Sequence, residues 1–335
     1  MSAPVSWGIL STAKIGVQKV IPALQKSPRL AVAAIASRDG ARAAAVAQTL
    51  GIPRAYGSYE ELLADPAIEA IYNPLPNHLH VPWTLRALAA GKHVLCEKPL
   101  ALDAAEARTL LAARESSGRL VAEAFMVRYH PQWRRTRELI RAGAIGEARA
   151  ITTEFAYFLR DPANVRNQAG IGGGGLMDIG CYAVATARYL FAAEPLRAAA
   201  VIDRDPDFGV DRLTSGLLEF PAGRRLAFTC ATQLAARQRV GVLGTRGRIE
   251  VMVPFNPAPD RSSRIVIDDG QDLEGGGARE EVFPACDQYT LQGEGFAAAI
   301  RGEAPLEYEL EDAVANMAAI DALFRAAASG RWEAV

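Results

Sequence analysis

The stretch that decides the fold stands near the N-terminus, where residues 5–16 read VSWGILSTAKIG. An apolar run, Val5–Leu10, leads directly into small and polar residues and then into an amphipathic segment. This order is typical of a strand that turns into the first helix of a dinucleotide-binding βαβ unit, where backbone N–H groups face a pyrophosphate. Compared with the G-x-G-x-x-G fingerprint, Ser11 and Ala13 replace the first two glycines and Gly16 keeps the third. A tight strand-to-helix turn without a nucleotide is the open alternative.

Apolar runs and amphipathic segments keep alternating as far as about residue 124, which predicts repeated βα units around a parallel sheet covered on both faces. The pattern changes after Phe125. The expected strands of this later part are Ala148–Phe158 and a series between Leu196 and Pro284, and two helices, Leu291–Arg301 and Leu310–Ala328, are expected to close it. The predicted fold class is therefore α/β: an N-terminal Rossmann dinucleotide-binding domain, residues 1–124, followed by an α+β domain, residues 125–335, with a large, mostly antiparallel sheet.

Composition limits the classes of partner. The chain has 335 residues, a formal net charge of -1, 50% hydrophobic residues and 22% charged residues. This balance excludes a global electrostatic attraction to nucleic acid or to a membrane surface, so we expect a small-molecule substrate. The four cysteines form no CxxC, which favours reduced thiols and predicts no metal site. The N-terminus lacks a secretory signal pattern, and we expect a cytoplasmic protein.

The second expected strand ends in Ala36-Ser37-Arg38-Asp39, about 20 residues past the first turn. At this place an acid binds a ribose 2′-OH, whereas a cation favours a 2′-phosphate. Ser37 and Arg38 favour NADP(H). Asp39 is the rival, because a shift of the strand end by one or two residues would place it there and favour NAD(H).

Two later strands end in polar, turn-forming clusters. Asn73 begins the run NPLPNHLH, and the strand His93–Cys96 leads into Glu97, Lys98 and a proline. Because the carboxyl ends of parallel strands meet at one edge, both loops are expected to line the same crevice. A lysine at that edge can polarise a substrate oxygen.

Four segments together resemble the glucose-fructose oxidoreductase and inositol dehydrogenase (Gfo/Idh/MocA) family. They are PNHLH at residues 76–80, AGKHVLCEKPL at 90–100, EAFMVRYHP at 123–131 and GGGGLMDIGCY at 172–182. The resemblance implies an NAD(P)-dependent oxidoreductase whose catalytic residues are Lys98, Asp178 and Tyr182. Many family members carry His at the last of these positions. With Tyr at this position, the chain resembles glucose-fructose oxidoreductase, the dimeric trans-dihydrodiol dehydrogenases and the NADP-dependent D-xylose dehydrogenases.

The chemistry explains a lysine beside a tyrosine. Hydride leaves a carbinol carbon for the nicotinamide while the hydroxyl proton goes to a base, and a tyrosine with a pKa of about 10 is a weak base near neutrality. The ammonium of Lys98 would stabilise the Tyr182 phenolate and lower that pKa. We assign Asp178, four residues before Tyr182 and on the same helix face, to substrate hydroxyl binding and to keeping Lys98 charged.

The resemblance also implies a set of binding residues. Those expected at the cofactor are Gly8, Ser11, Thr12, Ala13, Lys14, Ile15, Ser37, Arg38, Asn73, Pro74, Leu75, Asn77, His80, Glu97 and Lys98. Those expected at the substrate are Arg128, Tyr129, Phe155 and Asp178. Each weaker member has a structural alternative: a helix-start histidine for His80, the domain joint for Arg128 and Tyr129, and core packing for Phe155 and its neighbour Tyr157. Residues 172–175 read GGGG and are interpreted as a flexible approach to the helix that carries Asp178, since no Lys-Ser/Thr follows them.

The leading hypothesis is an NADP(H)-dependent dehydrogenase or reductase acting on the CH–OH group of a sugar, cyclic polyol or trans-dihydrodiol. The alternatives are a redox-neutral NAD-dependent glycosidase of the same fold and a non-catalytic NADP-binding sensor. Retention of both Lys98 and Tyr182 argues against the sensor, because a binder needs neither. The resemblance further implies a homodimer or homotetramer that assembles through the sheet of the second domain.

Overall fold

The computed structural model describes residues 3–335, and they form two compact units. The first unit runs to Met126 and also contains Asp287–Val314, and the second contains Val127–Cys286 and Ala315–Val335. Cys96, Cys181, Cys230 and Cys286, all within the described residues, form no disulfide. Within residues 3–335, no helix is long and apolar enough to cross a membrane, and no group of three or more His, Cys, Asp or Glu side chains is placed to hold a metal ion.

The elements of the first unit alternate as the sequence predicts. Its strands are β1 (Val5–Leu10), β2 (Leu30–Ala36), β3 (Arg54–Tyr56), β4 (Ala70–Asn73), β5 (His93–Cys96) and β6 (Val121–Glu123). Its helices are η1 (Gly16–Val20), α1 (Ile21–Leu24), α2 (Gly40–Leu50), α3 (Tyr59–Ala64), η2 (Asn77–Leu79), α4 (His80–Ala89), α5 (Ala104–Ser117) and α8 (Gln288–Ile300). The short η3 (Met126–Tyr129) leads out of it.

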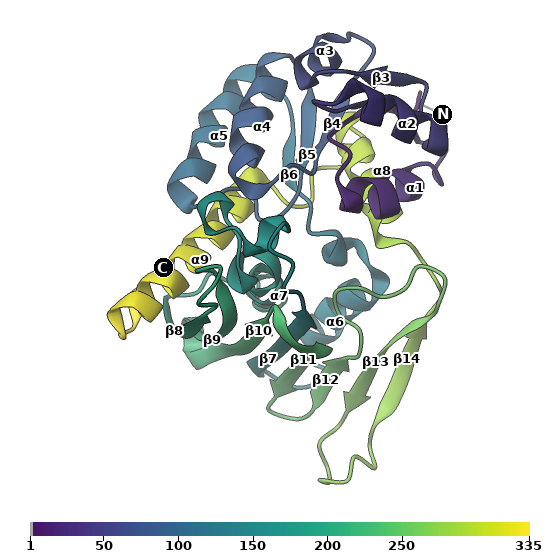
Figure 1. Ribbon diagram of the computed structural model, residues 1–335. Helices are drawn as coiled ribbons and strands as arrows, with labels where there is room; N and C mark the ends of the chain where they lie inside the picture. The colour runs from purple at the N-terminus through teal and green to yellow at the C-terminus, as the bar shows by residue number, and fades with distance from the viewer. Residues whose placement is uncertain (1–2) are drawn as a thin grey trace. The chain divides into compact units, whose positions relative to one another are not determined.

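The sheet of the first unit is parallel throughout, in the order β3-β2-β1-β4-β5-β6. This is the doubly wound order in which ligands bind outside the carboxyl ends of the strands, at the switch point between β1 and β4. Side chains alternate along β1, so Trp7 and Ile9 join Leu24 of α1 and Phe296 of α8 in one core on one face. Figure 1 shows α4 and α5 together on the other face of this sheet. The predicted Rossmann fold is confirmed.

Helix α8 corrects the expected division of the chain. The sequence analysis placed everything after residue 124 in the second domain, but residues 287–314 pack with the first unit. The reason is a close fit: a Cβ at Gly293 would lie 2.4 Å from Leu24 Cδ2, and the Phe296 ring lies 5.7 Å from that of Trp7. Helical periodicity predicts an apolar face without saying which core receives it.

The elements of the second unit follow the predicted change of rhythm. Its strands are β7 (Ala148–Phe158), β8 (Arg197–Arg204), β9 (Asp211–Phe220), β10 (Arg224–Ala231), β11 (Gln233–Gly244), β12 (Arg248–Val251), β13 (Ser263–Asp268), β14 (Arg279–Phe283) and β15 (Glu333–Ala334). Its helices are α6 (Pro131–Arg141), η4 (Val165–Asn167), η5 (Ala169–Ile171), η6 (Leu176–Gly180), α7 (Cys181–Phe191) and η7 (Pro221–Gly223). Helix α9 (Leu310–Ser329) begins in the first unit and continues in the second.

These strands form one sheet in the order β14-β13-β12-β11-β7-β10-β9-β8-β15. The pair β7 and β10 is parallel, and the other described pairs are antiparallel, which confirms the large, mostly antiparallel sheet. One face is covered by helices. On that face a Cβ at Gly216 would lie 3.0 Å from Leu323 Cδ2 of α9, and a Cβ at Gly180 of η6 would lie 3.6 Å from Phe228 Cε2. The opposite face is open, with Thr152, Glu154 and other side chains of the central strands exposed.

Candidate functional site

The first turn of the Rossmann unit is held in an unusual backbone conformation. Ser11 directly follows β1 and has φ +68°, the left-handed region in which the fingerprint normally places glycine. Its hydroxyl accepts a hydrogen bond from the N–H of Ala13 at 3.2 Å, which fixes the turn that a side chain disfavours. The replacement of glycine by Ser11 therefore keeps the conformation of the fingerprint. Of the other residues expected here, Thr12 is buried, Lys14 is exposed, and Ala13 and Ile15 are half-buried.

Gly8 has a packing role inside β1. It is buried there, and its expected place at the cofactor stays a prediction. A Cβ at this position would lie 2.6 Å from Leu62 Cδ2 and 3.0 Å from Ile68 Cγ2. Its missing side chain lets α3 pack closely on the sheet, so Gly8 supports the fold next to the turn.

Arg38 and Asp39, which follow the end of β2, have different surroundings. Asp39 is the N-cap of α2, and its carboxylate accepts a hydrogen bond from the N–H of Arg42 at 3.1 Å. Ser37 accepts one from the N–H of Asp39 at 3.2 Å. The Arg38 side chain is exposed and lies beside the hydroxyl of Tyr59. Burial raises the pKa of Tyr59, and Arg38 offsets part of this rise. The acid that would favour NAD(H) thus caps a helix, while the cation is accessible.

The loops after β4 and β5 are tied together by His80. This ring is buried, with Nδ1 2.8 Å from the carbonyl oxygen of Pro99 and Nε2 2.6 Å from that of Leu75. Burial lowers the pKa of His80 to about 4, although the two carbonyl oxygens favour the protonated ring. Both ring nitrogens face protein oxygens, so His80 fixes the two loops, and its expected place near the cofactor stays a prediction.

Asn73 organises the same loop from inside. Its side-chain amide donates to the carbonyl oxygen of His80 at 3.1 Å, and its side-chain oxygen accepts from the N–H of Leu75 at 3.3 Å. Asn73 is fully buried and its side chain shapes the turn, while its expected role at the cofactor stays a prediction. Pro74 and Leu75 are buried as well, while Asn77 is half-buried.

Glu97 is fixed just before the candidate lysine. The hydroxyl of the fully buried Tyr72 donates to Glu97 Oε1 at 2.7 Å, and the backbone N–H of Lys98 lies 3.3 Å from Oε2. Tyr289 of α8 lies within electrostatic range, since the charge of Glu97 adds to burial in raising its pKa. Lys98 is half-buried at the carboxyl end of β5, where the sequence analysis expected it.

In the second unit, Asp178 and Tyr182 lie on one continuous helical segment. Asp178 belongs to the π-helical turn η6, and Tyr182 lies in the first turn of α7, directly after it. A π turn needs more than four residues, so a spacing of four still covers nearly one turn. The expected common face is retained, although the geometry is wider than the α-helix that was predicted. Such π turns are frequent at functional sites.

Two side chains hold the Asp178 carboxylate. The hydroxyl of Tyr157, near the end of β7, donates to Oδ2 at 2.5 Å, and Nε of Arg166 in η4 lies 2.9 Å from Oδ1. Burial and then the charge of Asp178 raise the pKa of Tyr157. Tyr157 therefore stays protonated and donates, which makes it unsuitable as a base.

Tyr182 is fixed by aromatic packing. Its ring centroid lies 5.8 Å from that of Phe155 in an edge-on arrangement and 5.2 Å from that of Phe255. Phe155 is also stacked on Phe255 at 4.7 Å and is 5% exposed. Phe155 was expected to contact substrate, but its observed partners are aromatic side chains, and it sets the position of Tyr182.

The glycine-rich segment before η6 is pinned, contrary to the expectation that it is flexible. Asp211, at the start of β9, accepts hydrogen bonds from the N–H of Leu176 at 2.6 Å and from the hydroxyl of Thr214 at 3.0 Å. Gly174 has φ +113°, and a Cβ there would lie 1.9 Å from Asp211 Oδ1. Burial raises the pKa of Asp211 to about 6. The glycine allows the backbone to pass a buried carboxyl group.

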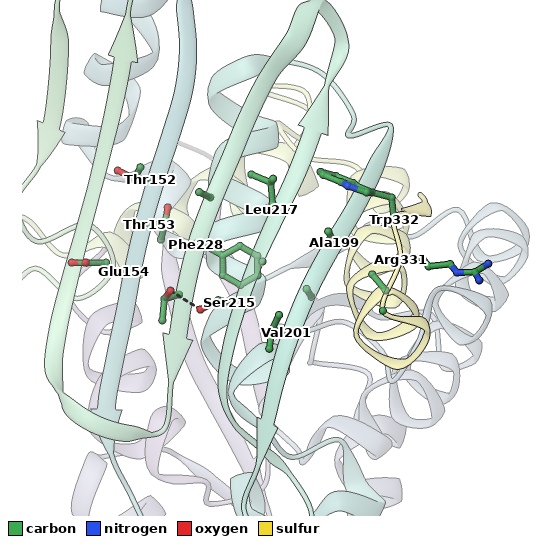
Figure 2. Close-up of a pocket in the computed structure, with 16 residues that line it drawn as sticks. Thr152, Thr153, Glu154, Ala199, Val201, Ser215, Leu217, Phe228, Arg331 and Trp332 are labelled. Atoms are coloured by element: carbon green, nitrogen blue, oxygen red, sulfur yellow. Dashed lines mark hydrogen bonds between the residues drawn. The ribbon is translucent and has the colours of Figure 1, made fainter.

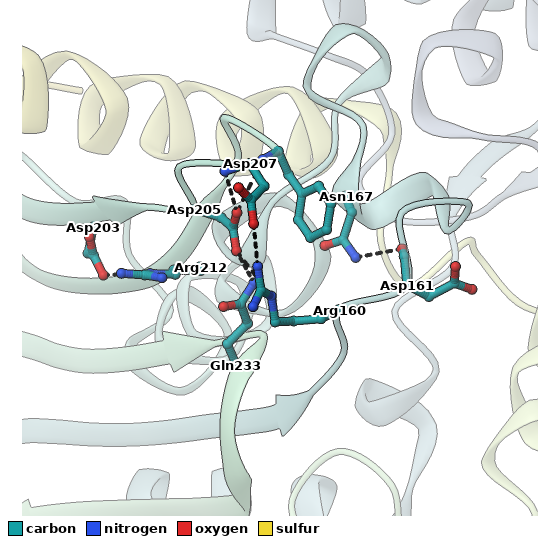
Figure 3. Close-up of polar contacts among 9 residues, drawn as sticks. Arg160, Asp161, Asn167, Asp203, Asp205, Asp207, Arg212 and Gln233 are labelled. Atoms are coloured by element: carbon teal, nitrogen blue, oxygen red, sulfur yellow. Dashed lines mark hydrogen bonds and ion pairs between the residues drawn. The ribbon is translucent and has the colours of Figure 1, made fainter.

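The loop that carries Arg166 is anchored to the β8–β9 hairpin. Arg160 forms ion pairs with two aspartates, with Nη2 2.5 Å from Asp207 Oδ2 and Nε 3.7 Å from Asp205 Oδ2. Figure 3 shows both aspartates facing its guanidinium. The Asp205 side chain is fully buried and also accepts from Gln233 at 2.6 Å. Asn167 donates to the carbonyl oxygen of Asp161 at 2.8 Å. These contacts give Arg166 a defined place.

Arg128 and Tyr129 belong to the short helix η3, and Arg128 contacts α7. Arg128 is 2% exposed and donates to the carbonyl oxygen of Ala185 in α7 at 3.4 Å. Tyr129 is 7% exposed, and the Arg134 guanidinium lies 5.7 Å from its ring centroid. Both are expected at the substrate with the domain joint as the alternative, and these contacts leave both as predictions.

Sequence reasoning missed Arg166 and Asp211. Arg166 stands in an aperiodic polar stretch, and Asp211 lies 33 residues from Asp178 at the start of a strand, so neither has a local signal. Tyr157 was found through its alternation along β7. The contacts of the Asp178 carboxylate with Tyr157 and Arg166 could not be predicted from the spacing of residues in the sequence.

Comparisons with known proteins cover most of the chain. Residues 5–125 match the model of an oxidoreductase family with an NAD-binding Rossmann fold, and residues 133–250 match the GFO/IDH/MocA C-terminal domain. A D-xylose 1-dehydrogenase (NADP(+)) of Haloferax volcanii is 42% identical over 326 residues, which is 97% of this chain and 98% of the relative.

Two further relatives are informative. The trans-1,2-dihydrobenzene-1,2-diol dehydrogenase of Mus musculus is 38% identical over 255 residues, 75% of each chain. The crystal structure of a 3-ketoreductase from Actinomadura kijaniata, in complex with NADP and TDP-benzene, superposes with a TM-score of 0.89 at 32% identity, covering 96% of this chain and 98% of that one.

Proposed function

The chain belongs to the GFO/IDH/MocA oxidoreductase family, and on that premise we propose that it transfers a hydride between NADP(H) and a carbinol carbon of a sugar, cyclic polyol or trans-dihydrodiol. Membership confirms the resemblance and makes it an NAD(P)-dependent oxidoreductase acting on CH–OH groups. In this proposal Tyr182 is the acid–base residue, Lys98 assists it, and Asp178 binds a substrate hydroxyl.

The observation that carries the proposal is the setting of Tyr182. Its ring is held by Phe155 and Phe255, and it stands one turn from a carboxylate fixed by two partners. Preorganised groups of this kind accelerate a reaction because they need no rearrangement as charge develops. Of the two tyrosines near Asp178, Tyr157 is held as a hydrogen-bond donor, which leaves Tyr182 for proton transfer.

The residues of the first unit fit a dinucleotide. The positive φ of Ser11 keeps the tight turn of the fingerprint, and the next helix starts directly behind it. Ser11, Thr12, Ala13, Lys14 and Ile15 would lie along the pyrophosphate, with Ser37 and Arg38 toward the ribose. When bound, the dinucleotide accepts or supplies the hydride. The chain's own groups bind the substrate oxygen and move its proton.

The acid–base step depends on a cation near the phenol. An unperturbed tyrosine with a pKa of about 10 is mostly protonated near neutrality, and a nearby positive charge favours the phenolate. In the oxidative direction Tyr182 Oη takes the hydroxyl proton as the hydride leaves the carbon. In the reductive direction the same oxygen returns the proton. Lys98 supplies the positive charge in this proposal.

The test is NADP⁺ reduction by the purified protein, followed by absorbance. The panel holds aldoses, anhydrosugars, inositols and trans-dihydrodiols, with NAD⁺ in parallel. We expect steady NADPH formation with one of these classes. Binding of NADP(H) without net reduction on any of them would contradict the proposal. Release of sugar from a glycoside without NADPH accumulation would then identify the redox-neutral glycosidase, and no reaction at all would identify the sensor.

Arg38→Ala should remove the preference for NADP⁺. In this proposal the exposed guanidinium of Arg38 binds the 2′-phosphate, and a charge-assisted hydrogen bond contributes about 1.5–3 kcal/mol, or roughly 10- to 100-fold in affinity. Titration of the variant with NADP⁺ and NAD⁺ measures the ratio of the two affinities. An unchanged ratio would show that Arg38 does not read the phosphate. Arg42→Ala, in the first turn of α2, tests whether the neighbouring cation shares this role.

The open face of the second unit's sheet is the proposed homo-oligomer interface. A hollow of about 750 Å³ lies along this face. Figure 2 shows Val201, Ser215, Leu217 and Trp332 among the side chains that line it. Val201 is 76% exposed and Trp332 is 41% exposed. Exposed apolar groups gathered on one surface mark contact sites in proteins that otherwise bury them. Because side chains alternate along β7, this face is opposite to Tyr157.

We expect a dimer or tetramer in sedimentation at micromolar concentration, and Val201→Glu should shift the protein to monomers. A charge at the centre of an apolar interface costs free energy unless it is paired. Arg38→Ala, in the other unit, is the matched control and should sediment as the unaltered protein does. A monomeric wild-type protein at that concentration would refute the assembly.

A further inference from the structure

The Arg166 guanidinium has hydrogen-bonding capacity left beside Asp178. Nε of Arg166 lies 2.9 Å from Asp178 Oδ1, and within residues 3–335 no hydrogen bond from Nη1 or Nη2 is found. The Arg166 side chain is 42% exposed, whereas that of Asp178 is 12% exposed. A guanidinium carries five N–H donors in a fixed plane, so one contact leaves most of its donors available.

The pair also stands close to the proposed acid–base group. The charge of Asp178 raises the pKa of Arg166, and Tyr182 is among the further groups that raise it. Arg166 therefore lies within electrostatic range of the Tyr182 phenol and remains a cation at every pH at which the protein is folded. Its place is defined by the anchored loop, in which Asn167 and Arg160 make the contacts drawn in Figure 3.

We propose that Arg166 and Asp178 together recognise a vicinal diol, with Arg166 donating to the oxygen next to the reacting hydroxyl. This inference rests on the proposed function of the same site. The Asp178 carboxylate accepts the proton of a hydroxyl, and the open edge of the guanidinium donates to a neighbouring oxygen. A donor and an acceptor side by side match two oxygens on adjacent carbons, each of which both donates and accepts.

The proposal explains why Tyr157 and Arg166 both contact the Asp178 carboxylate. Tyr157 and Arg166 hold one carboxylate oxygen each, so the plane of the carboxylate is fixed. Each oxygen has a second acceptor position for a hydroxyl. Tyr157 fixes the acceptor without adding a donor, because its single hydroxyl proton is used. Arg166 fixes the acceptor and also adds donors, so mutations can distinguish the role of Tyr157 from that of Arg166.

The experiment compares compounds that differ by one hydroxyl. D-xylose and its 2-deoxy analogue form one pair, and trans-cyclohexane-1,2-diol and cyclohexanol form the other. Binding of each to the NADP⁺-loaded protein is measured by ligand-observed NMR, beside kcat and KM where turnover occurs. The variants are Arg166→Met, Arg166→Lys, which keeps a cation beside Asp178 and so guards against misfolding, and Tyr157→Phe.

We expect the wild-type protein to prefer the diol in at least one pair. Arg166→Met should reduce that preference by about 10- to 100-fold, the value of a charge-assisted hydrogen bond, mainly through KM, and Arg166→Lys should change it in the same direction. Tyr157→Phe should weaken binding of both members of a pair alike and leave their ratio nearly unchanged. Equal losses of preference in Arg166→Met and Tyr157→Phe would overturn the proposal, as would a wild-type protein that binds neither diol.

The binding measurement separates this inference from the proposed redox function. A protein that binds diols through Arg166 without reducing NADP⁺ would refute the dehydrogenase and keep the diol site. A protein that reduces NADP⁺ with a preference independent of Arg166 would keep the dehydrogenase and refute the diol site.

Discussion

Tyr182→Phe should lower kcat by about 10²- to 10⁴-fold, the usual contribution of a positioned acid–base group, while NADP(H) binding stays nearly unchanged. The substitution removes the hydroxyl and keeps the ring, which packs against Phe155 and Phe255. The variant should therefore fold. Cofactor affinity should be retained because the first turn and Arg38 lie in the other unit.

Single-turnover and steady-state rates, with the cofactor titration beside them, measure this prediction. Tyr189→Phe is the matched control: Tyr189 is a buried tyrosine of the same helix, and its ring packs under the Arg137 guanidinium at 4.3 Å. That variant should keep the rate of the unaltered protein. If Tyr182→Phe turned substrate over at a near wild-type rate, Tyr182 would have no place in the mechanism.

Much of the first unit could be predicted from the sequence because its strands are buried apolar runs. The predicted bounds of β1 and β5 and the predicted end of β2 agree with the structure. Strand β3 was missed because Arg54–Tyr56 is a three-residue edge strand without an apolar run. The placement of α8 was wrong for a different reason: an amphipathic helix reveals that it has a buried face, but the partner of that face is a long-range property.

The candidate site was predictable where chemistry is local. Asp178 and Tyr182 were identified through a motif, and their spacing places them on one face in an α-helix as in the observed π turn. The internal contacts of His80 could not be predicted, because a histidine that binds two carbonyl oxygens has the same sequence signature as one that faces a ligand. Residues 172–175 looked flexible because the carboxyl group that pins them, Asp211, is distant in the sequence.

Gly174→Ala should be among the most destabilising single substitutions in the second unit. The backbone at this position has φ +113°, which L side chains rarely adopt and which costs of order 1–3 kcal/mol. The new Cβ would also lie 1.9 Å from Asp211 Oδ1 and 2.9 Å from its Cγ, so a buried carboxyl group must move. Overpacking of this kind costs about 1–3 kcal/mol more.

Gly174→Ala should impair the proposed chemistry as well as lower the stability of the fold. The carbonyl oxygen of Gly174 accepts a hydrogen bond from the N–H of Asp178 at 3.0 Å, and Asp211 holds the N–H of Leu176. A displaced Gly174 therefore shifts the π turn on which Asp178 stands. We expect thermal unfolding to begin at a temperature lower by several degrees, at roughly 2–4 °C per kcal/mol for a domain of this size.

Gly170→Ala is the control for this prediction, because it lies in the same loop, has no positive φ and would meet no atom within 4 Å. Its melting temperature should equal that of the unaltered protein. Gly174→Ala in an Asp211→Ala background should cost less than in the wild-type background, since the clash with the carboxyl group is absent and only the backbone strain remains. Fully additive losses would show that Asp211 and Gly174 do not interact, and the segment would then be the flexible approach that its glycines first indicated.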